Sequence, residues 1–304
     1  MAVLESLFPL ILISLIGYLV EQTKILPKDF PKVINKFLFY IALPIFFLGS
    51  FSEFSRDEVS NFIPYIFVNI LVISILYISY YLIINQTRIE KKDIASTITP
   101  SFVGNSLYFG FPVLATVLGN EYIPYGVIYV SFITITDFLG MFLTSKLTGK
   151  TFEVKKQVVE FLKTPVLIAS LVGLSLLLVN VALPEIVLHV THSFGNIIST
   201  LILFAFGMSF SYKAILGNIR LPLVVAINKL ILLPLVTYLV VYYFFPLPEI
   251  AAQASVVIAC MPSAFFNLVI ADNYDTNKDI TIASILLNSV LFFFVSIFWI
   301  NLVT

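Results

Sequence analysis

Residues 104–122 read "GNSLYFGFPVLATVLGNEY", and this stretch decides how the chain folds. It lies inside an apolar run long enough to cross a bilayer, yet it contains two asparagines and a glycine-proline break at Gly110 and Pro112. Pro112 has no N–H, and its ring collides with the carbonyl of Tyr108, so we expect an interrupted helix, loosened further by Gly110. Unpaired backbone groups in hydrocarbon cost several kcal/mol each, so the break predicts a place where protein or water satisfies them.

Composition places the whole chain in lipid. Of its 304 residues, 60% are hydrophobic and 11% are charged, and the mean hydropathy is +1.04, which is too apolar for a soluble globule. Runs of about 20 apolar residues suffice to cross about 30 Å of hydrocarbon as helices, and barrel strands would alternate in polarity instead. We predict an all-α integral membrane protein with ten spans, roughly at 3–21, 32–51, 60–84, 94–118, 122–145, 163–182, 185–210, 221–245, 249–271 and 279–302.

Positive charges predict the orientation. They fall into alternate connections, which are those after the first, third, fifth, seventh and ninth spans: Lys24, Lys28, Lys32, Lys36, Arg88, Lys91, Lys92, Lys146, Lys150, Lys155, Lys156, Lys163, Lys213, Arg220 and Lys278. On the other side only Arg56 appears. The positive-inside rule then places both termini outside the cytoplasm, in a multi-pass protein of the cytoplasmic membrane. A net charge of zero gives no indication of a nucleic-acid partner.

An internal repeat is predicted from the same pattern. The longest connection divides the chain into a first repeat (1–146), a cytoplasmic linker (147–162) and a second repeat (163–304), each repeat holding five spans. An odd number of spans per half inverts the second half in the membrane. Short echoes support this, because "PLILISLIG" (Pro9–Gly17) matches "PVLIASLVG" (Pro165–Gly173) and "GSFS" after Pro44 matches "MSFS" (Met208–Ser211).

The ninth span is broken like the fourth. It contains "ACMPSAFFNLVIADNY", in which Pro262 interrupts the helix as Pro112 is expected to do in the first half. A single proline kink is common in membrane helices, but two at matching repeat positions indicate a site. Half-helix N-termini favour an anion, and the opposing carbonyl ends favour a cation.

Four motifs in order resemble the auxin efflux carrier family, which includes the plant PIN carriers and prokaryotic organic-acid permeases. They are "INKFLFYIALP" (Ile34–Pro44), "NSLYFGFP" (Asn105–Pro112), "KLILLP" (Lys229–Pro234) and "MPSAFFNLVIADNY" (Met261–Tyr274). The resemblance implies inverted repeats whose broken spans 4 and 9 cross, with a substrate carboxylate near the crossing, elevator-like transport and a homodimer. The short central loop resembles the prokaryotic branch, which implies small carboxylates such as malate or malonate more than auxin itself.

Polar side chains beside the breaks are the candidate substrate ligands. The Asn105 amide can donate to a carboxylate while staying neutral, and Asn267 is its counterpart in the second half. Interhelical packing is the alternative role of such asparagines. The remaining candidates flank the two breaks, where each serine could also bond its own backbone: Ser101, Ser106, Gly110, Pro112, Pro262 and Ser263.

Two ionisable residues lie well inside spans, where a charge is costly and indicates a function. Lys229 could raise the local positive potential for an anion, anchor a carboxylate, or extend its amine towards the cytoplasmic surface. Asp137 could pair with Lys229 or act as a titratable coupling site. A buried Lys–Asp pair with a purely structural role is the remaining alternative.

Other functional classes fit less well. We find no HExxH, GxSxG, aspartate-rich prenyl-transferase motif or Walker loop, so neither an enzyme nor a primary pump is expected. His189 and His192 lack the further ligands of a metal site, and no cofactor or metal is expected. A bile-acid-type sodium symporter shares the crossover plan and needs cation ligands at the breaks. A non-transporting receptor on the same scaffold is the second alternative.

Overall fold

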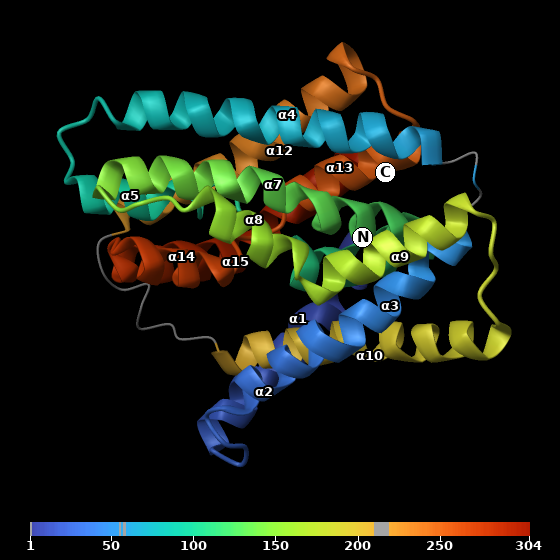
Figure 1. Ribbon diagram of the computed structural model, residues 1–304. Coiled ribbons are helices and arrows are strands. Elements are labelled where there is room, and N and C mark those ends of the chain that lie inside the picture. Colours follow the sequence, from blue (N-terminus) through green and yellow to red (C-terminus); the bar gives the residue numbers. More distant parts are fainter. Residues whose placement is uncertain (1, 55, 57–58, 210–218) are drawn as a thin grey trace. The chain divides into compact units, whose positions relative to one another are not determined.

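The computed structural model describes residues 2–54, 56, 59–209 and 219–304 (Figure 1). This described part is helical and contains no strand, which confirms the all-α prediction. Phe210, Ser211 and Lys213, on which the seventh span, one echo and part of the charge pattern rest, lie outside the described residues.

The helices follow the predicted spans closely. In chain order they are α1 (Ala2–Thr23), α2 (Phe30–Phe37), α3 (Leu43–Ser50), α4 (Val59–Ile84), α5 (Lys91–Ile98), α6 (Phe111–Val113), α7 (Ile123–Thr148), α8 (Val154–Leu162), α9 (Pro165–Leu178), α10 (Glu185–Ser209), α11 (Arg220–Ala226), α12 (Leu233–Leu239), α13 (Glu249–Ala259), α14 (Phe266–Tyr274) and α15 (Lys278–Val303). Wider π-helical turns continue several of them, at Leu38–Ala42, Ser106–Gly110, Leu114–Leu118, Ile227–Leu232 and Val240–Phe244.

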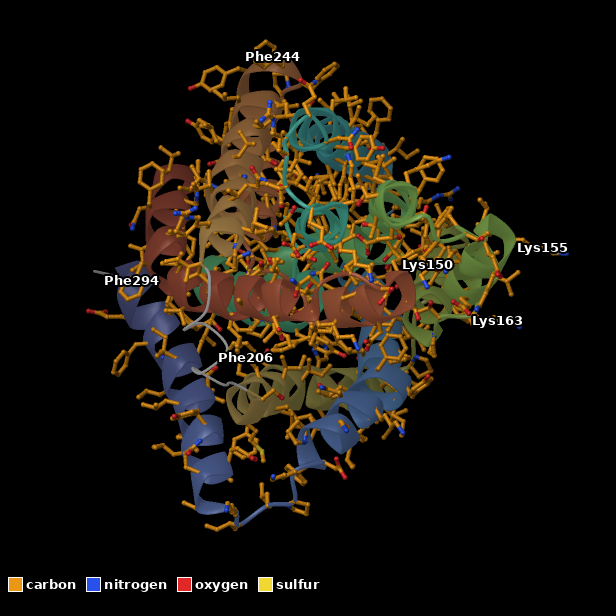
Figure 2. All side chains as sticks on the ribbon, turned by 90° about the vertical axis from the view of Figure 1, so that its left-hand side faces the viewer. Lys150, Lys155, Lys163, Phe206, Phe244 and Phe294 are labelled. Atoms are coloured by element: carbon orange, nitrogen blue, oxygen red, sulfur yellow. The ribbon has the colours of Figure 1, made fainter. Side chains whose placement is uncertain are left out.

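Several helices are long and apolar enough to cross a bilayer. Within the described residues there are six, and a bent pair, Val154–Leu162 with Pro165–Leu178, makes a seventh. Three more apolar helices are shorter: Leu7–Thr23, Ser106–Leu118 and Glu249–Ala259. Large apolar side chains lie on the outside, as lipid requires; Phe244 and Phe294 are 72% and 71% exposed and point outward in Figure 2. The protein is therefore a multi-pass membrane protein, while the number of ten spans stays a prediction.

The chain forms two compact units, and each unit is built from three segments that come from both halves of the sequence. Unit 1 comprises residues 1–63, 107–131 and 155–210, and unit 2 comprises residues 64–106, 132–154 and 211–304. These units are defined by packing, whereas the predicted repeats are defined by an internal symmetry. The division into units therefore does not test the predicted boundaries of the repeats.

Small residues set the packing of unit 1. Helices α1 and α10 approach so closely that a Cβ added at Gly17 would collide with the carbonyl of Phe204, and one added at Gly207 with that of Ser14. Helix α3 packs against α9 in the same way, because a Cβ at Gly173 would lie 2.8 Å from the Leu48 carbonyl oxygen. Such close backbone contact gives van der Waals attraction, which holds helices together in lipid.

Polar contacts connect the helices of unit 2. The Asn69 amide on α4 donates to the Ser255 hydroxyl on α13 at 2.9 Å. At the end of the unit, Asn277 precedes α15, accepts from its first N–H groups through its side chain, and donates to the Asp93 carboxylate on α5 at 2.8 Å. The bond between Asn277 and Asp93 therefore holds α5 and the α14–α15 connection together within unit 2.

Candidate functional site

Two helix breaks in unit 2, each a short non-helical segment between two helices, pair with each other. The first is residues 99–105, between α5 and the helical turns that start at Ser106; the second is residues 260–265, between α13 and α14. Gly104 and Ser263 form an antiparallel bridge. In it the Asn105 N–H donates to the Pro262 carbonyl at 2.7 Å, and the Ala264 N–H donates to the Val103 carbonyl at 3.0 Å. Each break thus satisfies backbone groups that the other leaves unpaired.

The first break does not lie where Pro112 predicted it. Pro112 is buried in helix, within the short α6 and between the π-helical turns Ser106–Gly110 and Leu114–Leu118. The same pattern recurs at Pro44 and Pro234, each the second residue after a π-helical segment. A π turn adds a residue per turn and so accommodates the missing N–H and the proline ring without breaking the helix. Gly110 and Pro112 belong to unit 1, and their role as site residues stays a prediction.

Pro100 is the proline of the first break, and the sequence contains a signal for it. The break residues "PSFVGN" (Pro100–Asn105) and "PSAFFN" (Pro262–Asn267) share proline, serine and asparagine at equal spacing. Aligned on this pattern, Ser101 corresponds to Ser263, and Asn105 corresponds to Asn267, the residue given above as its counterpart. Pro100, the proline that matches Pro262, lies four residues before Gly104 and so precedes the stretch 104–122.

Side chains reinforce the pairing of the two breaks. The Ser263 hydroxyl donates across to the Pro100 carbonyl at 2.6 Å and accepts from the amide of Asn288 on α15 at 2.5 Å. All three polar groups lie away from solvent, with Ser263 and Asn288 at most 1% exposed. Asn288 was not predicted, because a lone asparagine in an apolar span gives no signal of its partner.

Asn267 contributes an acceptor to the site. Its amide nitrogen donates to the carbonyls of Val103 at 3.3 Å and Ala264 at 2.8 Å. Within the described part of the chain, the side-chain oxygens of Asn267 and Asn288 have no hydrogen-bond partner. The two donor hydrogens of Asn267 are therefore engaged, and its oxygen is the atom that remains for a ligand. Asn105 and Ser106 are also buried at the first break, 4% and 7% exposed.

Asn228 and Lys229 face the breaks from the π-helical segment Ile227–Leu232. The Asn228 amide donates to the Ser101 hydroxyl at 3.3 Å, and the Lys229 amine donates to the carbonyl of Ala259, the last residue of α13, at 2.7 Å. Trp299 on α15 donates to the Leu230 carbonyl at 2.8 Å and holds this segment. The structure therefore brings predicted Lys229 to the breaks, together with Asn228 and Trp299, which were not predicted.

Comparison with known proteins identifies the family of the chain. The model of the membrane transport protein family (Mem_trans) matches residues 2–300. The chain belongs to this family. The match confirms the resemblance to the auxin efflux carriers. A similar protein is an uncharacterized transporter of Methanocaldococcus jannaschii, 22% identical over 298 residues, which cover 95% of each chain.

Asp137 of this Mem_trans protein does not pair with Lys229. Asp137 lies half-buried on α7, and within the described residues it makes neither an ion pair nor a hydrogen bond. The ion pairs of the described residues are at exposed positions instead: Asp29 with Lys32, Asp275 with Lys92, Glu185 with His189 and Asp272 with Lys278. The structural Lys–Asp pair is therefore not formed, and a coupling role for Asp137 stays a prediction.

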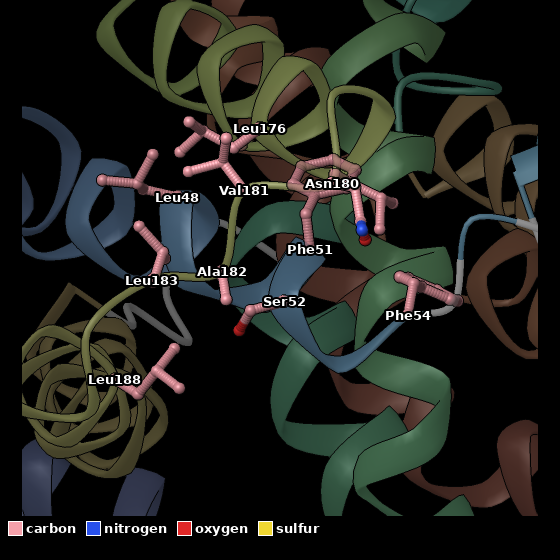
Figure 3. A pocket seen from close by; sticks show the side chains of 12 residues that line it. Leu48, Phe51, Ser52, Phe54, Leu176, Asn180, Val181, Ala182, Leu183 and Leu188 are labelled. Atoms are coloured by element: carbon pink, nitrogen blue, oxygen red, sulfur yellow. The ribbon is translucent and has the colours of Figure 1, made fainter.

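Two pockets lie in unit 1 of this Mem_trans protein. One, of about 190 Å³, is lined mainly by apolar side chains such as Leu48, Val181 and Leu188, with Asn180 and Ser52 as its polar groups (Figure 3). The other, of about 210 Å³, is more polar and is lined by Phe46, Ser50, Phe111, Ala115, Asn120, Ile123, His192, Gly195, Asn196, Ile198 and Ser199. Neither contains a residue predicted for substrate binding.

Proposed function

We propose that this protein is a secondary transporter of small organic anions, such as malate or malonate, and that the paired breaks of unit 2 bind the substrate carboxylate. The observation that carries the proposal is the backbone pairing of residues 99–105 with residues 260–265. Irregular backbone at membrane depth survives where protein or a water-filled cavity satisfies it, and broken helices of this kind form the binding sites of many transporters.

The charges around the breaks favour an anion. Helix α14 and the helical turns from Ser106 begin directly after the breaks, so the positive ends of their dipoles lie there. Lys229 adds a cationic side chain at the carbonyl end of α13, the end that would otherwise favour a cation. Asn105 and Ser106 supply neutral polar groups at the first break.

An elevator mechanism fits the distribution of these residues. The paired breaks, Asn267, Asn288 and Lys229 all belong to unit 2. An elevator requires that one compact part of the protein carries the substrate site. We further propose a homodimer in the cytoplasmic membrane with both termini outside the cytoplasm, ten spans and two inverted repeats, as the family resemblance and the charge pattern imply.

A sodium-coupled symporter of the bile-acid type is the second candidate. The buried side-chain oxygens of Asn267 and Asn288, without partners among the described residues, are the observation that favours it. Neutral amide oxygens are ligands for a hard cation. A receptor that binds the same anions without moving them would share the site and is separated from a transporter by the measurement of flux.

Uptake by reconstituted protein tests the proposal. Vesicles that contain the purified protein are supplied with labelled malate, malonate or succinate under an imposed pH, sodium or voltage gradient. We expect uptake of at least one of these dicarboxylates above that of protein-free vesicles. Binding without uptake in any gradient would indicate a receptor, and neither binding nor uptake of any carboxylate would refute the proposed function.

Asn105→Ala locates the site. Loss of the Asn105 amide at the first break is expected to lower uptake at least tenfold, which corresponds to about 1.4 kcal/mol of lost interaction. Asn301→Ala is the matched control, because Asn301 is exposed on α15 and its amide donates only to the carbonyl of Ile297 on the same helix. Uptake that is equal in both variants would remove Asn105 from the site.

A further inference from the structure

Lys229 occupies the position where a bound cation would be expected. The carbonyl end of a half-helix carries partial negative charge and attracts cations. At the end of α13 this attraction is taken up by the Lys229 amine, which donates to the Ala259 carbonyl at 2.7 Å. Lys229 is 1% exposed, so the contact is made inside unit 2 and away from bulk water.

The first break is shaped to accept the same amine. A Cβ added at Gly104 would lie 3.0 Å from both Cε and Nζ of Lys229, which is tighter than ordinary van der Waals contact. Gly104 is also the residue that bridges to Ser263 in the second break. The amine therefore lies against the backbone of one break while it bonds the helix end that leads into the other.

The protein supplies no carboxylate to balance this amine. Within the described residues every ion pair is at exposed positions, and Asp137, the acid predicted as its partner, does not contact it. A buried cation without an opposite charge is costly and persists in membrane proteins where function requires it. An anionic substrate is the missing opposite charge.

We propose that Lys229 is a built-in substitute for a co-transported cation, so that this protein binds its anion without sodium. The inference rests on the proposed anion transport and specifies how that site balances charge. The inference also decides against the sodium-coupled alternative. A sodium ion between the breaks would need the carbonyl end of α13 as a ligand, and there the Lys229 amine already occupies the Ala259 carbonyl and repels a second cation. The Asn267 and Asn288 oxygens then accept from water or from a donor group of the substrate.

Lys229→Met tests the charge while it keeps a flexible, unbranched side chain. We expect the concentration of malonate or malate for half-maximal uptake to rise at least tenfold in this variant. A purely structural lysine would instead lower the amount of folded protein and leave half-saturation of the folded fraction unchanged. Lys155→Met is the matched control, because Lys155 is exposed on α8, and its half-saturation should equal that of the unchanged protein.

Sodium dependence tests the same inference without any variant. The unchanged protein is reconstituted into vesicles of phosphatidylethanolamine and phosphatidylglycerol, and uptake is measured with sodium chloride or with choline chloride on both sides. We expect rates equal within twofold. Uptake that falls at least fivefold without sodium would overturn the role of Lys229 and leave the transport function intact, and so would unchanged half-saturation in Lys229→Met. Absence of carboxylate uptake and binding in both salts would refute the proposed function and this inference with it.

Discussion

Ser263 shows how much one hydroxyl contributes to the site. It donates to the Pro100 carbonyl in the other break and accepts from Asn288 on α15, so it joins three segments that are distant in the sequence. Buried polar groups that lose a partner cost about 1–3 kcal/mol each, more than the net gain from an average hydrogen bond. The geometry of the two breaks therefore depends on the small hydroxymethyl side chain of Ser263.

Ser263→Ala is expected to lower the free energy of unfolding by about 1–3 kcal/mol, because the Pro100 carbonyl and the Asn288 amide lose their partner. Thermal unfolding in detergent measures this change. Ser284→Ala is the control: Ser284 is equally buried, but its hydroxyl donates to the Ile280 carbonyl of its own helix. A melting temperature that falls no further in Ser263→Ala than in Ser284→Ala would contradict the role of Ser263.

At the residue scale the sequence predicted the polar candidates better than their roles. Asn105, Asn267 and Lys229 were predicted because polar groups are rare in apolar spans, and all three lie at the breaks. Substrate contact by Asn267 stays a prediction; the Val103 and Ala264 carbonyls engage both its amide hydrogens, so the atom available for that contact is its side-chain oxygen. Such contacts join residues far apart in the sequence, and no local pattern predicts them.

At the scale of elements, helices were predictable and the first break was misplaced. Apolar length alone placed the predicted spans over described helical segments, with 94–118 and 249–271 each covering two segments around a break, because a chain in hydrocarbon must satisfy its backbone locally. The position of a break depends on whether a proline is accommodated by π turns, as at Pro112, or ends the helix, as at Pro100. A proline in the sequence does not distinguish these outcomes, whereas a shared Pro-Ser-x-x-x-Asn pattern does.

Pro112→Ala tests this distinction. Pro112 lies in helix, so alanine restores an N–H without altering the break at residues 99–105, and we expect uptake within about threefold of the unchanged protein. Pro262→Ala is the comparison, because it adds an N–H to the buried second break, where unpaired donors are costly, and its uptake should fall at least tenfold. A comparable loss in Pro112→Ala would assign this proline to the substrate path, as predicted from the sequence.

The exposed ion pair between Lys92 and Asp275 in unit 2 gives a further prediction. Lys92, which lies 2.8 Å from Asp275, lowers the pKa of the Asp275 carboxyl, chiefly through their hydrogen bond and then through charge attraction. A lowered pKa in the folded state adds stability above the carboxyl's ordinary range, and this stability is lost only as the pH falls through the lowered value. Asp275→Asn should therefore cause the same small fall in melting temperature at pH 6 and pH 8. A fall at pH 8 alone would contradict this assignment.

At the scale of the molecule, each compact unit joins segments from both halves of the sequence. This mixing could not be read from the sequence, because echoes between halves report common ancestry or symmetry and not contact. Packing in unit 1 depends on glycines whose partners could not be predicted from the sequence either: Gly17 lies against Phe204, and Gly207 lies against Ser14. The two halves of the chain are therefore not expected to fold independently.

Gly207→Leu is expected to destabilise unit 1 by about 3 kcal/mol, since the new side chain collides with the Ser14 carbonyl and separates α1 from α10. Leu19→Val, on an exposed position of α1, is the control. Thermal unfolding in detergent compares the two variants. Equal melting temperatures would show that the two helices tolerate separation.

Orientation is tested by labelling in sealed cells or vesicles. Cys260 is the chain's only cysteine and is fully buried, so a maleimide is expected to label only the introduced cysteine. Positive charges predict that Lys155→Cys reacts with an impermeant maleimide from the cytoplasmic side, and Glu185→Cys from the outer side. The reverse pattern would place both termini in the cytoplasm.

Trp299 has one more consequence. It is the only tryptophan of the chain, its indole is 3% exposed, and its N–H bonds the carbonyl of the residue next to Lys229. Any rearrangement of that segment changes the surroundings of the sole strongly emitting chromophore. Titration of the unlabelled protein with a carboxylate can thus be followed as a shift in emission wavelength, so the protein carries its own optical reporter.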